Sequence, residues 1–175
     1  MRLSNWMSTD CWVRTTDRGY LLGAVGLLIL LVGCHSTTPE EQRRLPDVPV
    51  WYVLDLMSEG HALLEPLSQM SLTHPRTPED RLGHAGLLVT HLSGARGAFC
   101  AYEVACPYEW PTLVPVSLVP ESQLPSGLLL GAECPKCHSL YDLTMGVANP
   151  VRGPAKSPLT RYRCRRVDDL LLISN

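Results

Sequence analysis

From residue 49 onward, hydrophobic residues fall into short runs that glycine, proline, aspartate and serine separate. Such runs, several of them rich in β-branched and aromatic residues, are typical of strands. Residues 86–91 and 98–103 flank a glycine-containing turn and therefore predict a hairpin. Residues 61–67 predict one helical turn and the rest of 57–80 a loop, and no segment has the length and 3.6-residue period of a helix. The expected strands are residues 49–56, 86–91, 98–103, 114–119, 128–130, 139–143, 159–165 and 170–173. The pattern predicts an all-β, antiparallel domain of seven or eight short strands.

A different pattern precedes this domain. Residues 20–33 (YLLGAVGLLILLVG) form an uncharged run of fourteen residues that ends directly before Cys34, and Arg14 and Arg18 lie ahead of it. The run is short for a hydrocarbon core of about 30 Å, but it has the length of the hydrophobic region of a signal peptide. Small residues before a cysteine at this place resemble the lipobox of bacterial lipoproteins, in which the cysteine thiol is diacylated and the peptide is cut just before it.

This resemblance implies a signal peptide at residues 1–33, a lipid-anchored polar tether at 34–47 and a β domain at 48–175. Two or three acyl chains (palmitate, for example) on Cys34 make a lasting membrane anchor, whereas one chain holds only marginally. We therefore expect a protein of the cell envelope, in the periplasm or on the outer surface, held to the membrane by lipid. The alternative is a buried helix or a short membrane helix with an unrelated cysteine.

Charge and composition narrow the function classes. The 175 residues include 15 basic and 17 acidic side chains, a net charge of −2, which argues against binding to nucleic acid. The chain contains no G-x-S-x-G, phosphate-binding glycine loop or H-E-x-x-H, so hydrolase or transferase chemistry has no motif to support it. Whether the protein is an enzyme stays open, and the stronger expectation is that it is none, or at most an electron-transfer subunit.

Seven cysteines are the most informative feature of the composition. Cys134 and Cys137 form a C-x-x-C in a predicted turn, a spacing at which two thiolates can bind one metal ion or form a redox disulfide. Cys106 begins a similar turn with proline after a predicted strand, so the two loops can converge on one metal. Cys100 and Cys164 lie within predicted strands and are expected to be buried small hydrophobic residues.

Residues 134–142 (CPKCHSLYD) and 153–159 (GPAKSPL) resemble the second cluster loop and the proline loop of Rieske iron–sulfur domains, and residues 101–109 (AYEVACPYE) resemble the first cluster loop. The resemblance covers roughly residues 82–175. It implies a Rieske-like antiparallel β-sandwich with two cysteine-bearing loops. It also implies hydrogen bonds from Ser139 and Tyr141 to the metal centre, and a supporting role for Gly153 and Pro154.

The ligand pattern departs from that family. Cys106 and Cys134 match its two cysteine ligands, but Tyr108 and Cys137 stand where its two histidines belong. A Rieske cluster needs two cysteines on one iron and two histidines on the other. His138 follows Cys137 and is a further candidate ligand, although neighbouring residues in an extended turn point in opposite directions.

Two interpretations follow. In the first, Cys106, Cys134 and Cys137 with one unidentified group hold iron or a [2Fe–2S] cluster, and the protein transfers electrons to a redox partner protein. In the second, the protein is a non-enzymatic envelope lipoprotein whose cysteines bind a structural zinc or form a disulfide. The leader has no Arg-Arg pair, which argues against export of a folded, cluster-loaded chain and so favours a single zinc or iron, a disulfide or an empty site.

Overall fold

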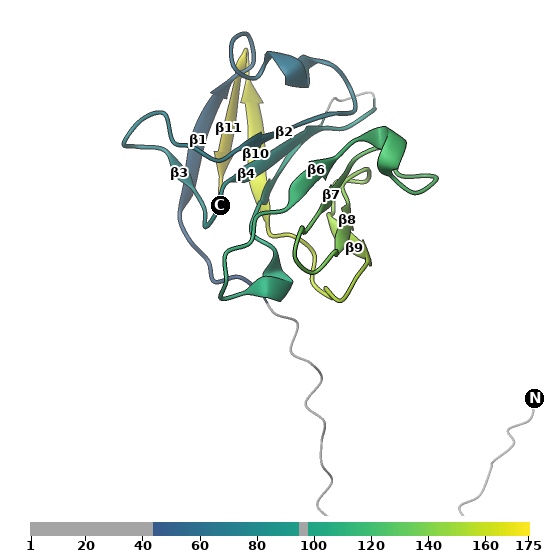
Figure 1. Ribbon diagram of the computed structural model, residues 1–175. Helices are drawn as coiled ribbons and strands as arrows, with labels where there is room; N and C mark the ends of the chain where they lie inside the picture. The colour runs from purple at the N-terminus through teal and green to yellow at the C-terminus, as the bar shows by residue number, and fades with distance from the viewer. Residues whose placement is uncertain (1–43, 95–97) are drawn as a thin grey trace, which may run out of the picture. The chain divides into compact units, whose positions relative to one another are not determined.

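The structure is a computed structural model that describes residues 44–94 and 98–175. Within these residues all regular structure is β-strand or short 3-10 helix, and no helix is long and apolar enough to cross a membrane (Figure 1). The 3-10 helices are His61–Leu64, Pro107–Glu109 and Glu121–Gln123. The strands are β1 (Val50–Asp55), β2 (Ser68–Leu72), β3 (Arg81–Leu82), β4 (Leu87–His91), β5 (Phe99–Glu103), β6 (Ser117–Val119), β7 (Gly131–Glu133), β8 (Leu140–Asp142), β9 (Asn149–Arg152), β10 (Arg161–Val167) and β11 (Leu170–Ser174).

The strands form two sheets, and every pairing is antiparallel. Seven strands are ordered β2-β4-β5-β10-β11-β1-β3, and four are ordered β6-β7-β8-β9. The predicted hairpin is β4–β5, in which His91 pairs with Phe99 and Leu87 with Glu103. The predicted all-β, antiparallel architecture with two cysteine-bearing loops is therefore confirmed. The predicted signal peptide, Cys34 and most of the tether lie outside the described residues.

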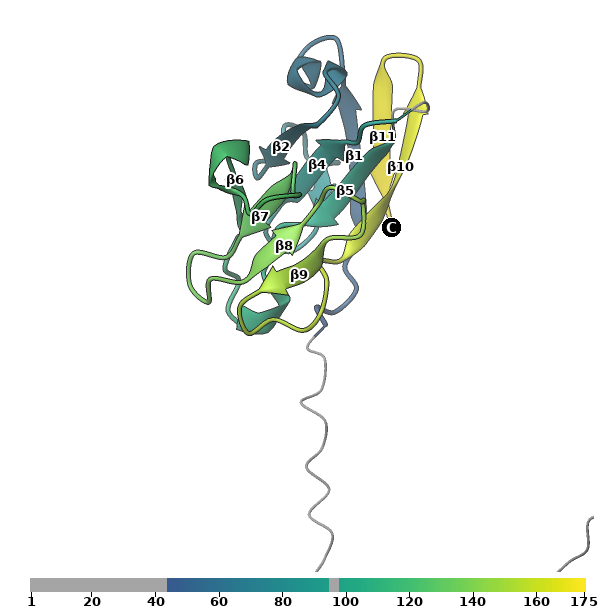
Figure 2. The same cartoon turned by 90° about the vertical axis from the view of Figure 1, so that its right-hand side faces the viewer.

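Two hydrophobic clusters hold the sheets in place. The first lies between the small sheet and strands β4 and β5, and includes Tyr102, Ala132 and Tyr141 (Figure 2). The second lies on the inner face of the large sheet, where that sheet curls so that β1 and β11 face β4, and includes Leu54 and Ile173 (Figure 1). Strands β4 and β5 separate the two clusters, so all their residues are buried. Burial on both faces explains why their sequences are almost continuously apolar.

Four strands differ from the sequence prediction, and one of them, β3, is a two-residue strand at an edge of the large sheet that was not predicted. Residues 68–72, expected to be loop, form β2 at the edge of the large sheet, where only half-burial is needed and a mixed polar sequence suffices. Strand β7 covers Gly131–Glu133, just after the predicted 128–130. Strand β9 was missed because it contains Pro150, which is tolerated there because β9 is an edge strand.

A buried carboxylate fixes the chain where it leaves the large sheet for the first cysteine loop. Glu103, at the end of β5, is fully buried. Its oxygens accept hydrogen bonds from the backbone N–H groups of His84, Ala85 and Ala105 at 2.7, 3.0 and 3.0 Å, and from the Tyr162 hydroxyl at 2.9 Å. Four donors satisfy this carboxylate without a cation, and they tie β5, β10 and the loop before β4 together.

Candidate metal centre

Two loops carry the three cysteines that the sequence singled out. Cys106 lies just after β5, and its N–H donates to the Val114 carbonyl at 2.9 Å, which holds the start of the first loop. Cys134 and Cys137 lie in the turn between β7 and β8, which the hydrogen bond from the His138 N–H to the Cys134 carbonyl closes at 2.9 Å. In each loop a proline follows the first cysteine and restricts the backbone at the turn.

The two loops bring the three thiols together. The Sγ atoms of Cys106, Cys134 and Cys137 all lie within 4.8 Å of one another, and those of Cys106 and Cys137 are 3.7 Å apart. With a metal–sulfur bond of about 2.3 Å, two thiolates on one tetrahedral ion lie about 3.8 Å apart. Cys106 and Cys134 are 0% exposed, whereas Cys137 is partly exposed. Small movements would therefore place all three sulfurs on one ion, with Cys137 on the solvent side.

Hydroxyl groups lie against two of the sulfurs. The Tyr141 hydroxyl is 3.3 Å from the Cys106 Sγ, and the Cys137 thiol donates to the Ser139 Oγ at 3.2 Å. Ser139 also accepts the Ala155 N–H at 3.0 Å, so its own hydroxyl hydrogen is free to turn toward a Cys137 thiolate. Both hydroxyl residues are those that the family resemblance implied.

Burial favours the neutral thiol at Cys106 and Cys134 unless something compensates for the charge of their thiolates. Burial raises the pKa of Cys106 to about 12, against the lowering effect of the Tyr141 hydroxyl and the Tyr108 N–H. Burial likewise raises the pKa of Cys134, although the backbone N–H groups of Cys137 and Lys136 lower it. A cation bound to the sulfurs would supply the missing compensation, because thiolates rather than thiols are metal ligands.

An ion pair joins the two loops beside the thiols. The Lys136 Nζ lies 2.5 Å from the Glu109 Oε2, and the Glu109 side chain is only 8% exposed. The hydrogen bond to Glu109 raises the pKa of Lys136, so this side chain is charged. The pair was not predicted, because the two residues are far apart in sequence and each reads alone as an ordinary surface charge.

His138 lies outside the group of thiols. Its backbone has a φ of +56°, its side chain is 73% exposed, and its Nδ1 lies 3.2 Å from the Glu133 Oε1. Glu133 also pairs with the Arg152 Nη2 at 2.7 Å. Within residues 44–94 and 98–175, no imidazole or carboxylate joins the three sulfurs.

Gly153 and Pro154, the other two residues predicted at the site, lie in the loop that contacts Ser139. Gly153 has a φ of +91°, and a Cβ there would lie 2.5 Å from the Ser139 Cα, so only glycine lets this loop approach Ser139. Pro154 follows it in the same loop, which carries the Ala155 N–H to Ser139. Cys100 is 1% exposed, as predicted for a packed thiol, whereas Cys164 is only partly buried.

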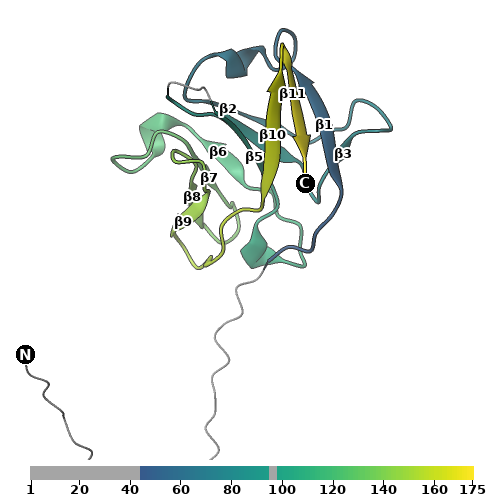
Figure 3. The same cartoon turned by 180° about the vertical axis from the view of Figure 1, so that it is seen from behind.

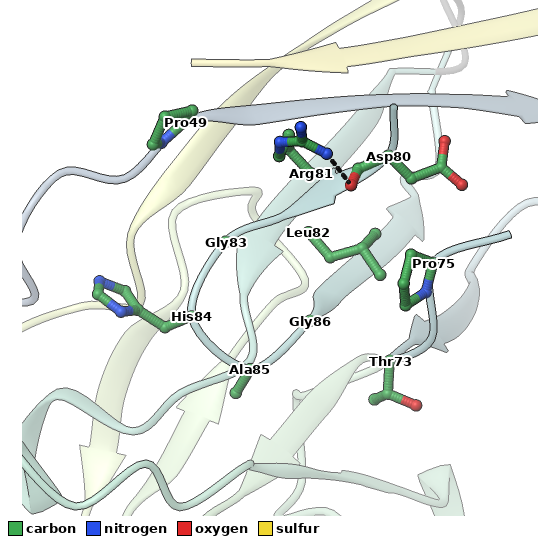
Figure 4. Close-up of a pocket in the computed structure, with 10 residues that line it drawn as sticks. All are labelled: Pro49, Thr73, Pro75, Asp80, Arg81, Leu82, Gly83, His84, Ala85 and Gly86. Atoms are coloured by element: carbon green, nitrogen blue, oxygen red, sulfur yellow. Dashed lines mark hydrogen bonds between the residues drawn. The ribbon is translucent and has the colours of Figure 1, made fainter. Parts of the chain in front are cut away.

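A second concave region lies elsewhere, against the loop before β4 (Figure 4). It has a volume of about 450 Å³, and its charged groups are already engaged. The Asp80 carboxylate accepts the Arg76 and Thr77 N–H groups at 2.8 and 3.0 Å, and the Arg81 guanidinium donates to the Asp80 carbonyl at 3.1 Å. It offers no set of convergent unpaired polar groups, so the three thiols remain the better candidate.

Comparisons with known proteins add little to this geometry. No protein-family model matches the chain, and no curated protein matches it. Among solved structures, the chain is similar to one from the complex of reduced oxygenase and oxidized ferredoxin in carbazole 1,9a-dioxygenase. That similarity has 15% identity and a TM-score of 0.42, and it covers 71% of this chain and 93% of the other. A similarity at this level assigns no function to the chain.

Proposed function

We propose that this protein binds one iron ion through the thiolates of Cys106, Cys134 and Cys137 and transfers single electrons, and that lipid on Cys34 holds it to the membrane. The observation that carries the metal site is the convergence of three thiols within 4.8 Å, from two loops, two of them fully buried. Three soft thiolate donors favour iron, zinc or copper(I) over magnesium or calcium.

A single ion fits the donor set better than a Rieske cluster. That cluster requires two histidines on its second iron. Tyr108 and Cys137 occupy the matching positions, and the His138 imidazole is turned toward Glu133. The short distance between the Cys106 and Cys137 sulfurs, 3.7 Å, is that of two ligands on one ion. The fourth position then belongs to water or another group from solvent, on the side of the partly exposed Cys137.

The surroundings of the thiols support electron transfer. Iron supplies a one-electron change when bound, and hydrogen bonds to its sulfur ligands stabilise their negative charge and so set the potential. The Tyr141 and Ser139 hydroxyls would donate such bonds to thiolates at Cys106 and Cys137, and N–H groups in both loops supply others. A redox partner would approach on the side of Cys137, where the centre is nearest to solvent.

Structural zinc is the second candidate. Complete burial of Cys106 and Cys134, with the Glu109–Lys136 pair joining their two loops, suits an ion that serves only to hold those loops together. A disulfide between Cys106 and Cys137 would fasten the same loops without metal, and would require their sulfurs to approach from 3.7 Å to about 2.05 Å.

The lipid anchor rests on the sequence before residue 44. If Cys34 is acylated, radiolabelled fatty acid enters the full chain and fails to enter Cys34→Ala, which then leaves the membrane fraction. Equal labelling of both chains, or a Cys34→Ala variant that stays membrane-bound, would contradict the anchor and leave the metal site unaffected.

The metal site is tested by elemental analysis and a visible spectrum of the full chain purified without oxygen. We expect about one iron per chain and thiolate-to-iron absorption in the oxidised protein. Cys106→Ser should lose both, whereas Cys100→Ser, which alters another buried thiol in the same fold, should keep both. A colourless protein with one zinc would support the structural role, and a metal-free protein with a Cys106–Cys137 disulfide would contradict both metal proposals.

A further inference from the structure

One outward-facing part of the large sheet carries arginine and apolar side chains together. Along β10, exposed Arg161, Arg163 and Arg165 alternate with buried Tyr162 and half-buried Cys164, so the three arginines share one face. Alternate residues on a strand stand about 6.8 Å apart, so the guanidinium groups follow one another at roughly that spacing. Strands β10, β11 and β1 lie side by side here (Figure 3).

Register extends this face across two more strands. Arg163 pairs with Ser174, which pairs with Trp51, and this row runs from β10 through β11 to β1. Trp51 is 49% exposed. The next row consists of Arg165, Leu172 and Val53. We call these seven residues the basic face, and they are Trp51, Val53, Arg161, Arg163, Arg165, Leu172 and Ser174.

Among the residues that the structure describes, no carboxylate forms an ion pair with the arginines of the basic face. Arg163 and Arg165 make no ion pair with any residue in 44–94 or 98–175, and the Arg161 Nη2 contacts the Cys100 sulfur at 3.2 Å rather than a carboxylate. Acidic side chains on these strands lie toward the opposite end, at Asp55 and at the β10–β11 turn. One end of the face is therefore strongly basic.

The tether leaves the domain at this same end. Leu45 and Asp47 line one small pocket with Arg161 and Asn175, so the described chain begins beside the start of β10. Asp47 is the single acidic residue of that pocket. Cys34 lies ten residues before Arg44, and ten residues span at most about 35 Å. An anchor on Cys34 would hold the basic face close to the bilayer.

We propose that the basic face rests on the membrane surface and binds anionic phospholipid headgroups, an inference that depends on the lipid anchor proposed above. Arginines attract anionic headgroups, each by a factor of about five in affinity near the surface, and tryptophan favours the interface between headgroups and acyl chains. Tethering raises the effective concentration of the face at the bilayer, so weak contacts suffice. Exposed tryptophan beside unpaired arginines fits an anionic lipid surface better than an acidic protein, because an acidic protein would complement the arginines but not the tryptophan.

The test places one tryptophan on the face and asks whether lipid reaches it. In the anchored protein, from which the proposed cleavage before Cys34 removes Trp6 and Trp12, replacing Trp110 by phenylalanine leaves Trp51 as the sole tryptophan. The protein is reconstituted into phosphatidylcholine vesicles with and without about one third phosphatidylglycerol, and both carry brominated acyl chains that quench tryptophan. We expect Trp51 to be quenched in the anionic vesicles and largely unquenched in the neutral ones.

Charge variants decide which residues recognise the lipid. Arg163→Ser should lower the ratio of docked to undocked protein about five-fold, and the double variant with Arg165→Ser about 25-fold. Lys156→Ser, which removes an exposed charge outside the face, should change nothing. Unquenched Trp51 in anionic vesicles, quenching that ignores lipid charge, or crosslinking of the face to an acidic protein would each overturn the proposal.

Metal content is measured in the same samples, so failure of this inference is distinct from failure of the metal site. If Cys34 proves not to be acylated, the proposed anchor fails while the lipid-binding proposal stays testable. The chain is then added to the same two kinds of vesicle, and flotation reports whether the basic face still selects anionic lipid. Flotation with neither kind of vesicle would overturn the lipid proposal.

Discussion

Replacing Gly153 by alanine tests how the proline loop supports the candidate metal centre. An added Cβ would lie 2.5 Å from the Ser139 Cα and 2.8 Å from its N, and backbone atoms cannot swing aside as a flexible side chain can. The φ of +91° adds a conformational penalty that any residue with a Cβ incurs, about 1–2 kcal/mol. Overpacking of a filled site typically costs about 1–3 kcal/mol more.

The two costs predict a loss of about 2–5 kcal/mol in the free energy of unfolding. In urea, a domain of this size should then unfold at a midpoint about 1–2 M lower. Circular dichroism follows the transition, and metal analysis of the folded variant reports on the site. Because the clash moves Ser139 away from Cys137, metal content should fall together with stability.

Gly127 provides the matched control. Its φ is +94°, but among the described residues none beyond its two chain neighbours has an atom within 4 Å of where its Cβ would stand. Gly127→Ala should therefore incur only the backbone penalty, about 1–2 kcal/mol, and retain the metal. If Gly153→Ala proved no more destabilising than Gly127→Ala, the close approach of this loop to Ser139 would not be a feature of the folded protein.

Further predictions concern other contacts of the site and its support. Tyr162→Phe removes one donor from buried Glu103 and should lower the free energy of unfolding by about 1.5–3 kcal/mol in urea denaturation, and an unchanged midpoint would contradict the role of this contact. Tyr141→Phe should raise the rate of metal loss to a chelator and lower the reduction potential, because a thiolate that loses a hydrogen bond stabilises the oxidised ion. A potential equal to that of the wild type would exclude the hydrogen bond between the Tyr141 hydroxyl and the Cys106 sulfur. Burial raises the pKa of Cys106 and Cys134, so metal binding must displace at least two protons. The affinity for the metal should therefore fall about 100-fold for each unit of decreasing pH below 8. Chelator competition at several pH values measures this affinity, and a flat profile would exclude thiol ligands.

The strands that the sequence predicted are those whose burial produces a local run of apolar residues. Strands β4 and β5 are buried on both faces and read as continuous apolar runs, so the hairpin was found almost to the residue. Strand β2 is half-buried at a sheet edge, and β9 contains Pro150, so neither has the pattern of a typical strand. A prediction from periodicity detects burial, and edge strands are where burial is weakest.

The candidate site shows the same division between local and long-range information. The cysteine spacing and proline turns indicated that Cys106, Cys134 and Cys137 could converge, and the structure places their sulfurs within 4.8 Å. The pair between Glu109 and Lys136 depends on how two distant loops meet, and no local pattern reports that distance. The His138 side chain points outward because its backbone has a positive φ. A glycine at this position would have indicated a positive φ from the sequence, but a histidine does not.

The distances between the three sulfurs also bear on how many metal ions the site could hold. From the sequence, a two-iron cluster and a single ion were both open, because the position of Cys137 relative to Cys106 was unknown. By the family resemblance Cys106 and Cys137 would bind different irons, so their separation of 3.7 Å, which equals that of two sulfurs on one tetrahedral ion, supports the proposed single ion. This distance is the reason for proposing a single ion in place of a Rieske cluster.

X-ray absorption at the metal edge, on the full chain purified without oxygen, tests the central claim most directly. The method counts the atoms around the metal and identifies a second metal nearby. We predict iron with three sulfur neighbours at about 2.3 Å, one lighter neighbour and no iron–iron distance. A spectrum with an iron–iron distance, with two nitrogen neighbours per iron pair, or with no bound metal at all would contradict a single ion held by Cys106, Cys134 and Cys137.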